Sequence, residues 1–203
     1  ISQGHYNAVC THFGQPTQLD AAQFGSCAHR VRLWWTNLVA PQRLAEATSY
    51  ARPPAGLNVM TVLEPNRFPA PVRNLDFPPR FPVNHPGEVM AAFPTFMAHP
   101  FSHNFRPGRP GSVWDVGQDM HDQPSAVERE RAMGYEVGAT AAPGVTEQQR
   151  RTVLGRCMDA NTTAAIMSVA TGGMACWLTQ GRTSASAAFV IVYGPVSTAS
   201  QPR

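Results

Sequence analysis

Charged and apolar residues alternate over residues 30–36, Arg30-Val31-Arg32-Leu33-Trp34-Trp35-Thr36, and this period of two is typical of a β-strand with unlike faces. A shorter strand is expected at 16–20, and the turn residues Phe24-Gly25-Ser26 separate the two. Residues 5–10 predict a helical or turn approach to the first strand. The N-terminal part therefore predicts two strands joined by a turn.

The C-terminal part changes to a helical pattern. Ser125 and Glu128 have the spacing of a capping box, which predicts a helix that ends near Met133, and Thr146 has the position of a second N-cap. Helices are therefore expected at 125–133, 146–154 and 159–169, followed by a strand at 183–192 and a frayed tail after Tyr193.

Prolines divide the chain, because fifteen of the nineteen fall between Pro41 and Pro124. Each proline removes a backbone donor and clashes with a preceding helical turn, so this segment is expected to form irregular loops with short strands at 57–63 and 88–93. Three regions are therefore predicted, at 1–40, 41–124 and 125–203.

Composition narrows the class of protein. No run of apolar residues approaches the roughly 18 that a membrane-spanning helix needs, so no membrane partner is expected. The net charge of +3 permits a polyanionic partner without requiring one. All sixteen cationic side chains are Arg, which fits either a GC-biased genome or selection for planar groups that grip phosphates and bases. The first residues carry neither an initiator Met nor a signal pattern, which favours an internal start.

The four cysteines lie far apart and form no C-x-x-C pair, so reduced thiols are expected and no metal site is predicted. His99 and His103 have a spacing that zinc sites use, but without cysteine partners they are expected to be exposed or interface histidines. The loop around Arg106 and Arg109 mixes cations with aromatic residues. It either contacts a DNA groove or packs against the main sheet.

Three segments carry the functional pattern. In the first, Ala28-His29-Arg30-Val31-Arg32, a strand places both guanidinium groups on one face. The second is a helix at 128–135, Glu-Arg-Glu-Arg-Ala-Met-Gly-Tyr, ending in a glycine that suits a left-handed cap. The third, Leu154-Gly155-Arg156-Cys157, joins a helix, a glycine turn and a new helix. Each segment alone is common in structural roles.

In this order and spacing, the three segments resemble the eighth, ninth and tenth motifs of the DNA (cytosine-5) methyltransferases, most closely those of the de novo type. The resemblance covers about 19–38 and 125–167. It implies an α/β fold: part of a Rossmann-like methyltransferase domain with a Pro-rich, loop-rich target-recognition insertion at 41–124. It also implies double-stranded DNA as partner, S-adenosylmethionine as methyl donor and the nucleus as location.

The resemblance implies a role for each matching residue. Arg32 would donate to O2 of a flipped cytosine, and Arg30 would hold the same pocket, so these two are the expected catalytic residues. Gly155, Arg156, Cys157 and Met158 would lie near the methyl donor. Glu128 and Arg131 would have a structural role at the base of the recognition region, with Arg106 and Arg109 as DNA contacts.

The chain lacks other parts of the family's reaction centre. No cysteine follows a proline, and neither Glu-Asn-Val nor a Phe-x-Gly-x-Gly turn occurs. The sequence therefore predicts a C-terminal portion that does not methylate DNA by itself and needs a catalytic half or a homologous methyltransferase subunit. Two alternatives are an inactive regulatory or DNA-binding module of the same fold and a Pro-rich interaction protein.

Overall fold

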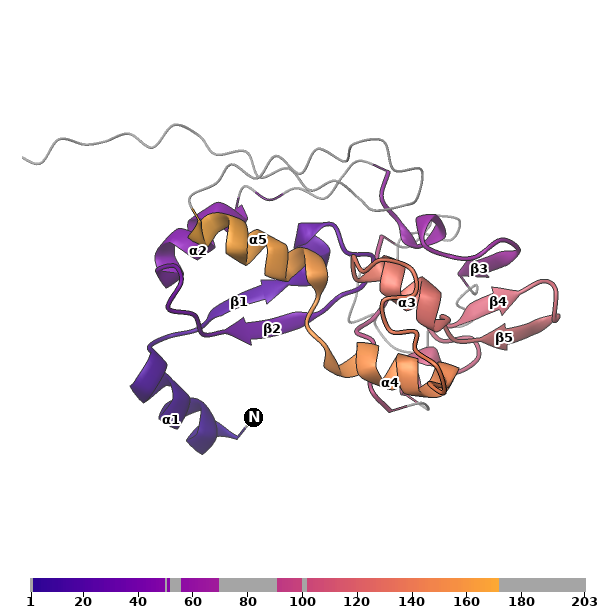
Figure 1. Ribbon diagram of the computed structural model, residues 1–203, viewed down its shortest axis with the longest axis horizontal. Helices are drawn as coiled ribbons and strands as arrows, with labels where there is room; N and C mark the ends of the chain where they lie inside the picture. Colours follow the sequence, from indigo (N-terminus) through magenta and orange to yellow (C-terminus); the bar gives the residue numbers. More distant parts are fainter. Residues whose placement is uncertain (1, 50, 52–55, 70–90, 100–101, 172–203) are drawn as a thin grey trace, which may run out of the picture.

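The computed structural model describes residues 2–49, 51, 56–69, 91–99 and 102–171 (Figure 1). It shows a mixed chain of helices and strands with small sheets. The helices are α1 (Gln3–Phe13), α2 (Pro41–Ser49), α3 (Ala126–Ala132), α4 (Glu147–Arg156) and α5 (Ala160–Ala170). The strands are β1 (Thr17–Asp20), β2 (Val31–Trp34), β3 (Arg67–Pro69), β4 (Val113–Asp115) and β5 (Met120–Asp122).

The two predicted N-terminal strands are confirmed. β1 and β2 pair in antiparallel register, with Leu19 opposite Arg32. Asp20 ends β1 and, with Gln23, forms a capping box for a short 3-10 helix at Ala21–Phe24. Gly25 then turns the chain at φ 86°, a value that favours glycine.

Helices α2 and α5 cover one face of this strand pair, as Figure 1 shows. The shared core contains Leu19, Phe24, Leu44, Ile166 and Val169, all nearly fully buried. Residues from both ends of the chain therefore complete one hydrophobic cluster, and α5 is held against β1 and β2 by burial of apolar surface.

The Pro-rich segment differs from its prediction in two places. α2 was not expected, yet Pro41 stands in its first turn, where the missing N–H costs no hydrogen bond. The strand prediction at 57–63 is wrong, because Asn58 caps a 3-10 helix at Val59–Thr61. Of the strand expected at 88–93, residues 88–90 lie outside the described residues, and Phe93 forms an isolated parallel bridge with Ala28.

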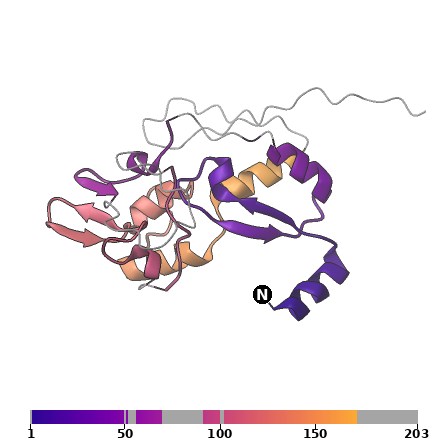
Figure 2. The same ribbon diagram turned by 180° about the vertical axis from the view of Figure 1, so that it is seen from behind.

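A second core lies at the other end of the molecule, next to the antiparallel sheet β3-β4-β5 (Figure 2). Its largest buried side chains are Phe93, Phe96, Val113, Met133 and Leu154. These residues come from the Pro-rich segment and from α3 and α4 alike. The cluster therefore joins the predicted second and third regions through shared packing.

The three predicted C-terminal helices are confirmed, including the capping box of Ser125 and Glu128. Gly134 follows α3 at φ 76°, in the left-handed region. The prediction of a glycine turn at Gly155 is wrong, because α4 continues through Gly155 and ends at the C-cap residue Cys157. Gly155 instead allows close packing: a Cβ there would lie 2.5 Å from the carbonyl carbon of Met97.

Helix α1 extends away from both cores in Figures 1 and 2 and has no buried residue. Its Tyr6 ring packs edge-on against Trp35 at a centroid distance of 6.1 Å. In the described ranges, every helix is too short or too polar to cross a lipid bilayer. The strand expected at 183–192 and the tail after Tyr193 lie outside the described residues.

Candidate functional site

Arg30 is a buried cation that joins three distant parts of the chain. Only 5% of its surface is exposed. Its guanidinium donates to the carbonyl oxygens of Phe96 at 3.4 Å, Gly155 at 3.2 Å, and Cys157. Burial, with the nearby Arg32 charge, lowers the pKa of Arg30 below its ordinary value. Its Nε is buried and, among the described residues, has no hydrogen-bond acceptor.

The backbone leading to Arg30 is fixed by Asp20 at the end of β1. The Asp20 carboxylate accepts from the Arg30 N–H at 2.8 Å and contacts the His29 ring at 2.8 Å. Burial alone would raise the pKa of Asp20, but these hydrogen bonds outweigh it and lower the pKa. The start of β2 is therefore anchored before its side chains reach the site.

A pocket of about 160 Å³ lies between β2 and the junction of α4 with α5. One side is lined by Arg30, which directly precedes β2, and by Arg32, Leu33 and Trp34 of the strand. Side chains alternate along a strand, so Arg32 and Trp34 share a face. Residues 156–159 and Thr162 line the other side. This volume is below the roughly 300–1,000 Å³ of pockets for drug-sized ligands, so it suits a single small ring or an anion.

The charges around this pocket are mostly positive. Arg32 is exposed and its guanidinium donates only to the carbonyl of Val31, among the hydrogen bonds of the described residues. In the part of the chain that the structure describes, Arg30, Arg32 and Arg156 form no ion pair within 4.0 Å. An acceptor-rich ligand would therefore meet guanidinium groups that no carboxylate neutralises.

Asp159 is the carboxylate in the wall of the pocket, and the protein already uses its oxygens. It caps α5 by accepting from the Thr162 N–H at 2.9 Å and accepts from the Ser26 hydroxyl at 2.7 Å. Burial raises its pKa, although these bonds oppose the shift. Asp159 therefore positions the α4–α5 junction and leaves the arginines available.

A second hollow of about 690 Å³ is also lined in part by residues 156–158. Tyr135, Ala160, Ala164 and Met167 line it together with that segment. Arg156, Cys157 and Met158 therefore form a wall shared by a small cationic pocket and a larger, mostly apolar groove. The Tyr135 hydroxyl donates to the Met158 carbonyl and braces this wall.

Arg67 forms a second buried cationic centre, 8% exposed, which is fully paired. Its guanidinium donates to Glu128 at 2.8 Å, Asp115 at 2.8 Å and Asp122 at 3.2 Å. Glu128 also accepts from the Glu64 N–H at 3.0 Å. This network fastens α3 to the sheet β3-β4-β5.

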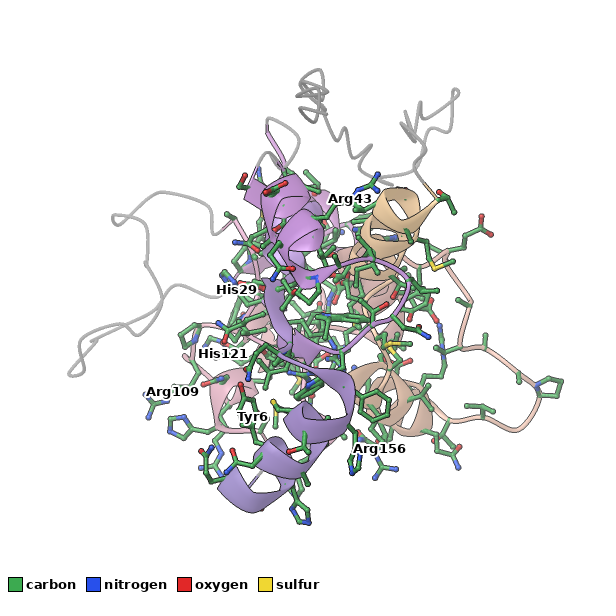
Figure 3. All side chains as sticks on the ribbon, turned by 90° about the vertical axis from the view of Figure 1, so that its left-hand side faces the viewer. Tyr6, His29, Arg43, Arg109, His121 and Arg156 are labelled. Atoms are coloured by element: carbon green, nitrogen blue, oxygen red, sulfur yellow. The ribbon has the colours of Figure 1, made fainter. Side chains whose placement is uncertain are left out.

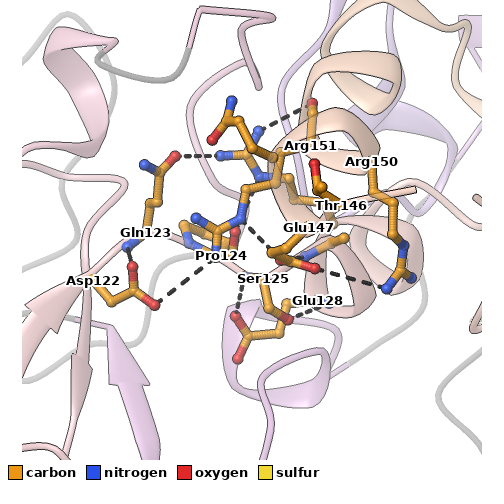
Figure 4. A network of polar contacts seen from close by, with 12 residues as sticks. Asp122, Gln123, Pro124, Ser125, Glu128, Thr146, Glu147, Arg150 and Arg151 are labelled. Atoms are coloured by element: carbon orange, nitrogen blue, oxygen red, sulfur yellow. Dashed lines mark hydrogen bonds and ion pairs between the residues drawn. The ribbon is translucent and has the colours of Figure 1, made fainter. Parts of the chain in front are cut away.

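Further polar contacts join α3 to α4, as Figure 4 shows. Glu147 accepts from the Ala126 N–H at 2.6 Å and from Arg151 at 2.9 Å. Glu130, fully buried, accepts from Arg150 at 2.9 Å and from the Gly138 N–H at 2.7 Å. These contacts hold α4, and thus the segment that follows it, at a fixed place.

The structure brings some of the predicted site residues together. Arg30, Arg32, Arg156, Cys157 and Met158 line the small pocket, while Gly155 contributes a backbone carbonyl to Arg30. Glu128 and Arg131 instead contact residues 62–67, where Arg131 donates to the Val62 carbonyl at 3.3 Å.

Arg106 and Arg109 belong to neither hollow. They lie in the turn after the 3-10 helix His103–Phe105, and Figure 3 shows Arg109 well apart from Arg156. Within the described ranges, no three His, Cys, Asp or Glu side chains lie close enough to hold a metal ion.

Sequence reasoning missed the parts played by Trp34, Asp159 and Arg67. Trp34 could have been found, because it continues the period-two series of Arg30 and Arg32. Asp159 was expected only as a helix start. Arg67 shows no local pattern, since its partners are 48 to 61 residues away.

Comparisons with known proteins identify no family for this chain. A scan of protein-family models finds no match. A search of curated proteins finds none either.

Proposed function

We propose that this chain is the C-terminal part of a DNA cytosine-5 methyltransferase and supplies the pocket for a flipped cytosine. One observation carries the proposal. The Arg-x-Arg strand meets the Leu-Gly-Arg segment at a pocket small enough for a single ring. A hydrogen bond between Arg30 and Gly155 joins the two segments, although these residues are 125 positions apart.

Arg32 is the side chain proposed to contact the base. It lines the pocket and has no carboxylate partner among the described residues, so its donors are available to a ring carbonyl. Attack at C6 of cytosine moves negative charge toward O2, and a fixed cation there stabilises the transition state more than the ground state. Arg30 is a positioning residue, because its bonds to the carbonyls of Gly155 and Cys157 set the pocket walls.

The groove beside the pocket fits S-adenosylmethionine in chemistry. The adenosyl group would meet apolar surface from Tyr135, Met158 and Met167. Arg156 would pair with the carboxylate of the methionine part. When bound, S-adenosylmethionine supplies the methyl group. The shared wall at 156–158 would keep the two ligands in neighbouring hollows.

Within this proposal, β1 and β2 belong to a Rossmann-like sheet that other segments complete. Residues 41–124 form the target-recognition insertion, with Arg106 and Arg109 on DNA, and the protein works in the nucleus. The thiolate nucleophile and the glycine-rich donor turn come from another segment or subunit, since no Pro-Cys pair occurs in the sequence. The absence of a Pro-Cys pair also favours a second candidate function, a non-catalytic module that keeps the pocket.

The experiment measures binding of the chain to two short DNA duplexes by fluorescence anisotropy. One duplex is fully paired, and the other holds one mismatched cytosine, which leaves the stack at lower cost. We expect tighter binding to the mismatched duplex, and Arg32→Ala to abolish that preference. Loss of one hydrogen bond to a charged donor corresponds to about 10-fold or more in affinity.

Arg43→Ala is the matched control, because Arg43 is exposed on α2, outside the pocket. It should keep the preference for the mismatched duplex. Equal binding of both duplexes by the unaltered chain, or an unchanged preference in Arg32→Ala, would overturn the proposal.

A further inference from the structure

Two residues that line the small pocket each have a buried side-chain N–H without an acceptor among the described residues. Among the described residues, the side-chain nitrogens that are buried without a partner are Arg30 Nε, Trp34 Nε1 and His121 Nδ1. Arg30 and Trp34 both line the pocket. An indole N–H and a guanidinium N–H can only donate, and leaving either unpaired in a buried place destabilises the protein.

Arg30 and Trp34 line the pocket from the β2 side, and the Trp34 ring also packs against the core cluster that contains Leu19. Arg32 and Trp34 lie two residues apart in β2, and Arg30 directly precedes the strand, so period-two alternation puts the three side chains on one face. Across the pocket, both oxygens of Asp159 already accept from Thr162 and Ser26. Asp159 therefore does not serve as an acceptor for Arg30 Nε or Trp34 Nε1.

The neighbouring tryptophan provides a contrast. Trp35, the next residue, leaves on the opposite face, and its Nε1 donates to the Gly14 carbonyl at 3.1 Å. Its donor is therefore satisfied within the protein. The two adjacent indoles therefore differ in whether the N–H group has an acceptor within the described part of the protein.

We propose that Trp34 is a substrate-binding residue whose indole N–H donates to the O2 carbonyl of the pyrimidine, alongside Arg32. A carbonyl oxygen has two lone pairs and can accept from both side chains. Because Trp34 Nε1 is buried in this structure, the proposal requires the Trp34 ring to turn so that its N–H faces the ligand. This inference rests on the proposed function and adds a second donor where negative charge develops.

The combination of the Trp34 and Arg32 donors also defines the class of ligand. The substrate class is a pyrimidine nucleotide with a carbonyl at position 2, because a ring without that oxygen leaves Trp34 Nε1 unpaired. A phosphate is another acceptor-rich group that three arginines attract. The probes must therefore separate the base from the phosphate.

The test follows the indole N–H signals of the full chain by ¹⁵N–¹H correlation NMR, assigned with Trp34→Phe. Addition of 2′-deoxycytidine 5′-monophosphate should move the Trp34 signal downfield and leave Trp35 unchanged. Cytosine base should give the same shift, whereas 4-aminopyrimidine, which lacks the carbonyl, and 2-deoxyribose 5-phosphate should not. A downfield shift with the sugar phosphate alone would overturn the proposal.

Affinity for the nucleotide gives the second measurement. Trp34→Phe keeps an aromatic ring and should weaken binding about 10-fold, whereas the matched Trp35→Phe should change it less than twofold. If Arg32→Ala abolishes binding but Trp34→Phe does not weaken it, the Trp34 inference fails and the proposed function stands. If the unaltered chain does not bind the nucleotide, both fail.

Discussion

Arg30 and Arg67 are both buried, but their surroundings differ. Arg67 donates to three carboxylates, from Asp115, Asp122 and Glu128. Arg30 donates only to backbone carbonyls within the described residues and keeps one nitrogen unpaired. A buried cation without a counter-charge is costly to keep. The comparison shows that full pairing accompanies a structural junction and incomplete pairing accompanies the pocket.

The largest effect is expected from Arg67→Met. This change leaves three carboxylates without their cation, and breaking a buried ion pair costs about 3–5 kcal/mol in the free energy of unfolding. Urea denaturation followed by circular dichroism measures the loss. A loss below about 1 kcal/mol would show that the network is not what fastens α3 to the β3-β4-β5 sheet. Arg43→Ala is the control and should have little effect.

A smaller loss is expected on the Arg30 side from Gly155→Ala. The new methyl group would meet the backbone of Met97 and Ala98, which cannot move as a side chain end would. Overpacking of this kind costs about 1–3 kcal/mol. Gly4→Ala is a matched control, because a Cβ there meets nothing within 4 Å. Equal stability of the two variants would contradict the close packing of α4.

Arg30→Lys should cost about 1 kcal/mol, since it keeps the charge but loses the planar fork that reaches several carbonyls. The same change at Arg67 should cost more, because one ammonium cannot serve three carboxylates. Thermal unfolding of both variants, measured side by side, sharpens the comparison. A larger loss of stability in Arg30→Lys than in Arg67→Lys would contradict the expected order of the two sites.

The smallest effect is a pH dependence that differs between the two regions. Burial acts to raise the pKa of Asp115, but hydrogen bonds from Arg67 and the Gln118 N–H outweigh it and lower the pKa below its ordinary 3.8. Its stabilising contribution is therefore present above that value and is lost as pH falls through the lowered pKa.

Asp159 has the opposite sign, because burial raises its pKa above 3.8. Its contribution is present below the ordinary value and is lost as pH rises through the raised one. Denaturation between pH 6 and 3 should show that Asp115→Asn flattens the acid-side fall in stability and Asp159→Asn steepens it. If the free energy of unfolding depends on pH equally in both variants, Asp115 and Asp159 do not make opposite contributions.

Local patterns predicted much of the fold. The capping boxes at Ser125 and Thr146 and the alternation of β2 depend on neighbouring residues, so they are readable from the sequence. The prediction failed where tertiary packing decides. The proline pattern predicts a loop at Pro41, which instead begins α2. The sequence predicts a turn at Gly155, whose missing Cβ instead admits another backbone.

The candidate site could be predicted only in part. The resemblance to a family predicts Arg30 and Arg32 at one pocket and residues 155–158 near a second ligand, and the structure brings these segments into contact. The bonds of Arg30 to backbone carbonyls and the unpaired Trp34 nitrogen depend on contacts between distant residues. The Arg67 network likewise joins residues that no local period connects.

The hydrogen bond between Arg30 and Gly155 closes a loop of 125 residues. On the ribosome, the β1–β2 hairpin can emerge long before the residues that complete the pocket have been translated. A nascent chain that stops short of Cys157 would expose the Arg30 side chain to water and to non-specific polyanions. The small pocket is therefore complete only after both of its walls have been translated.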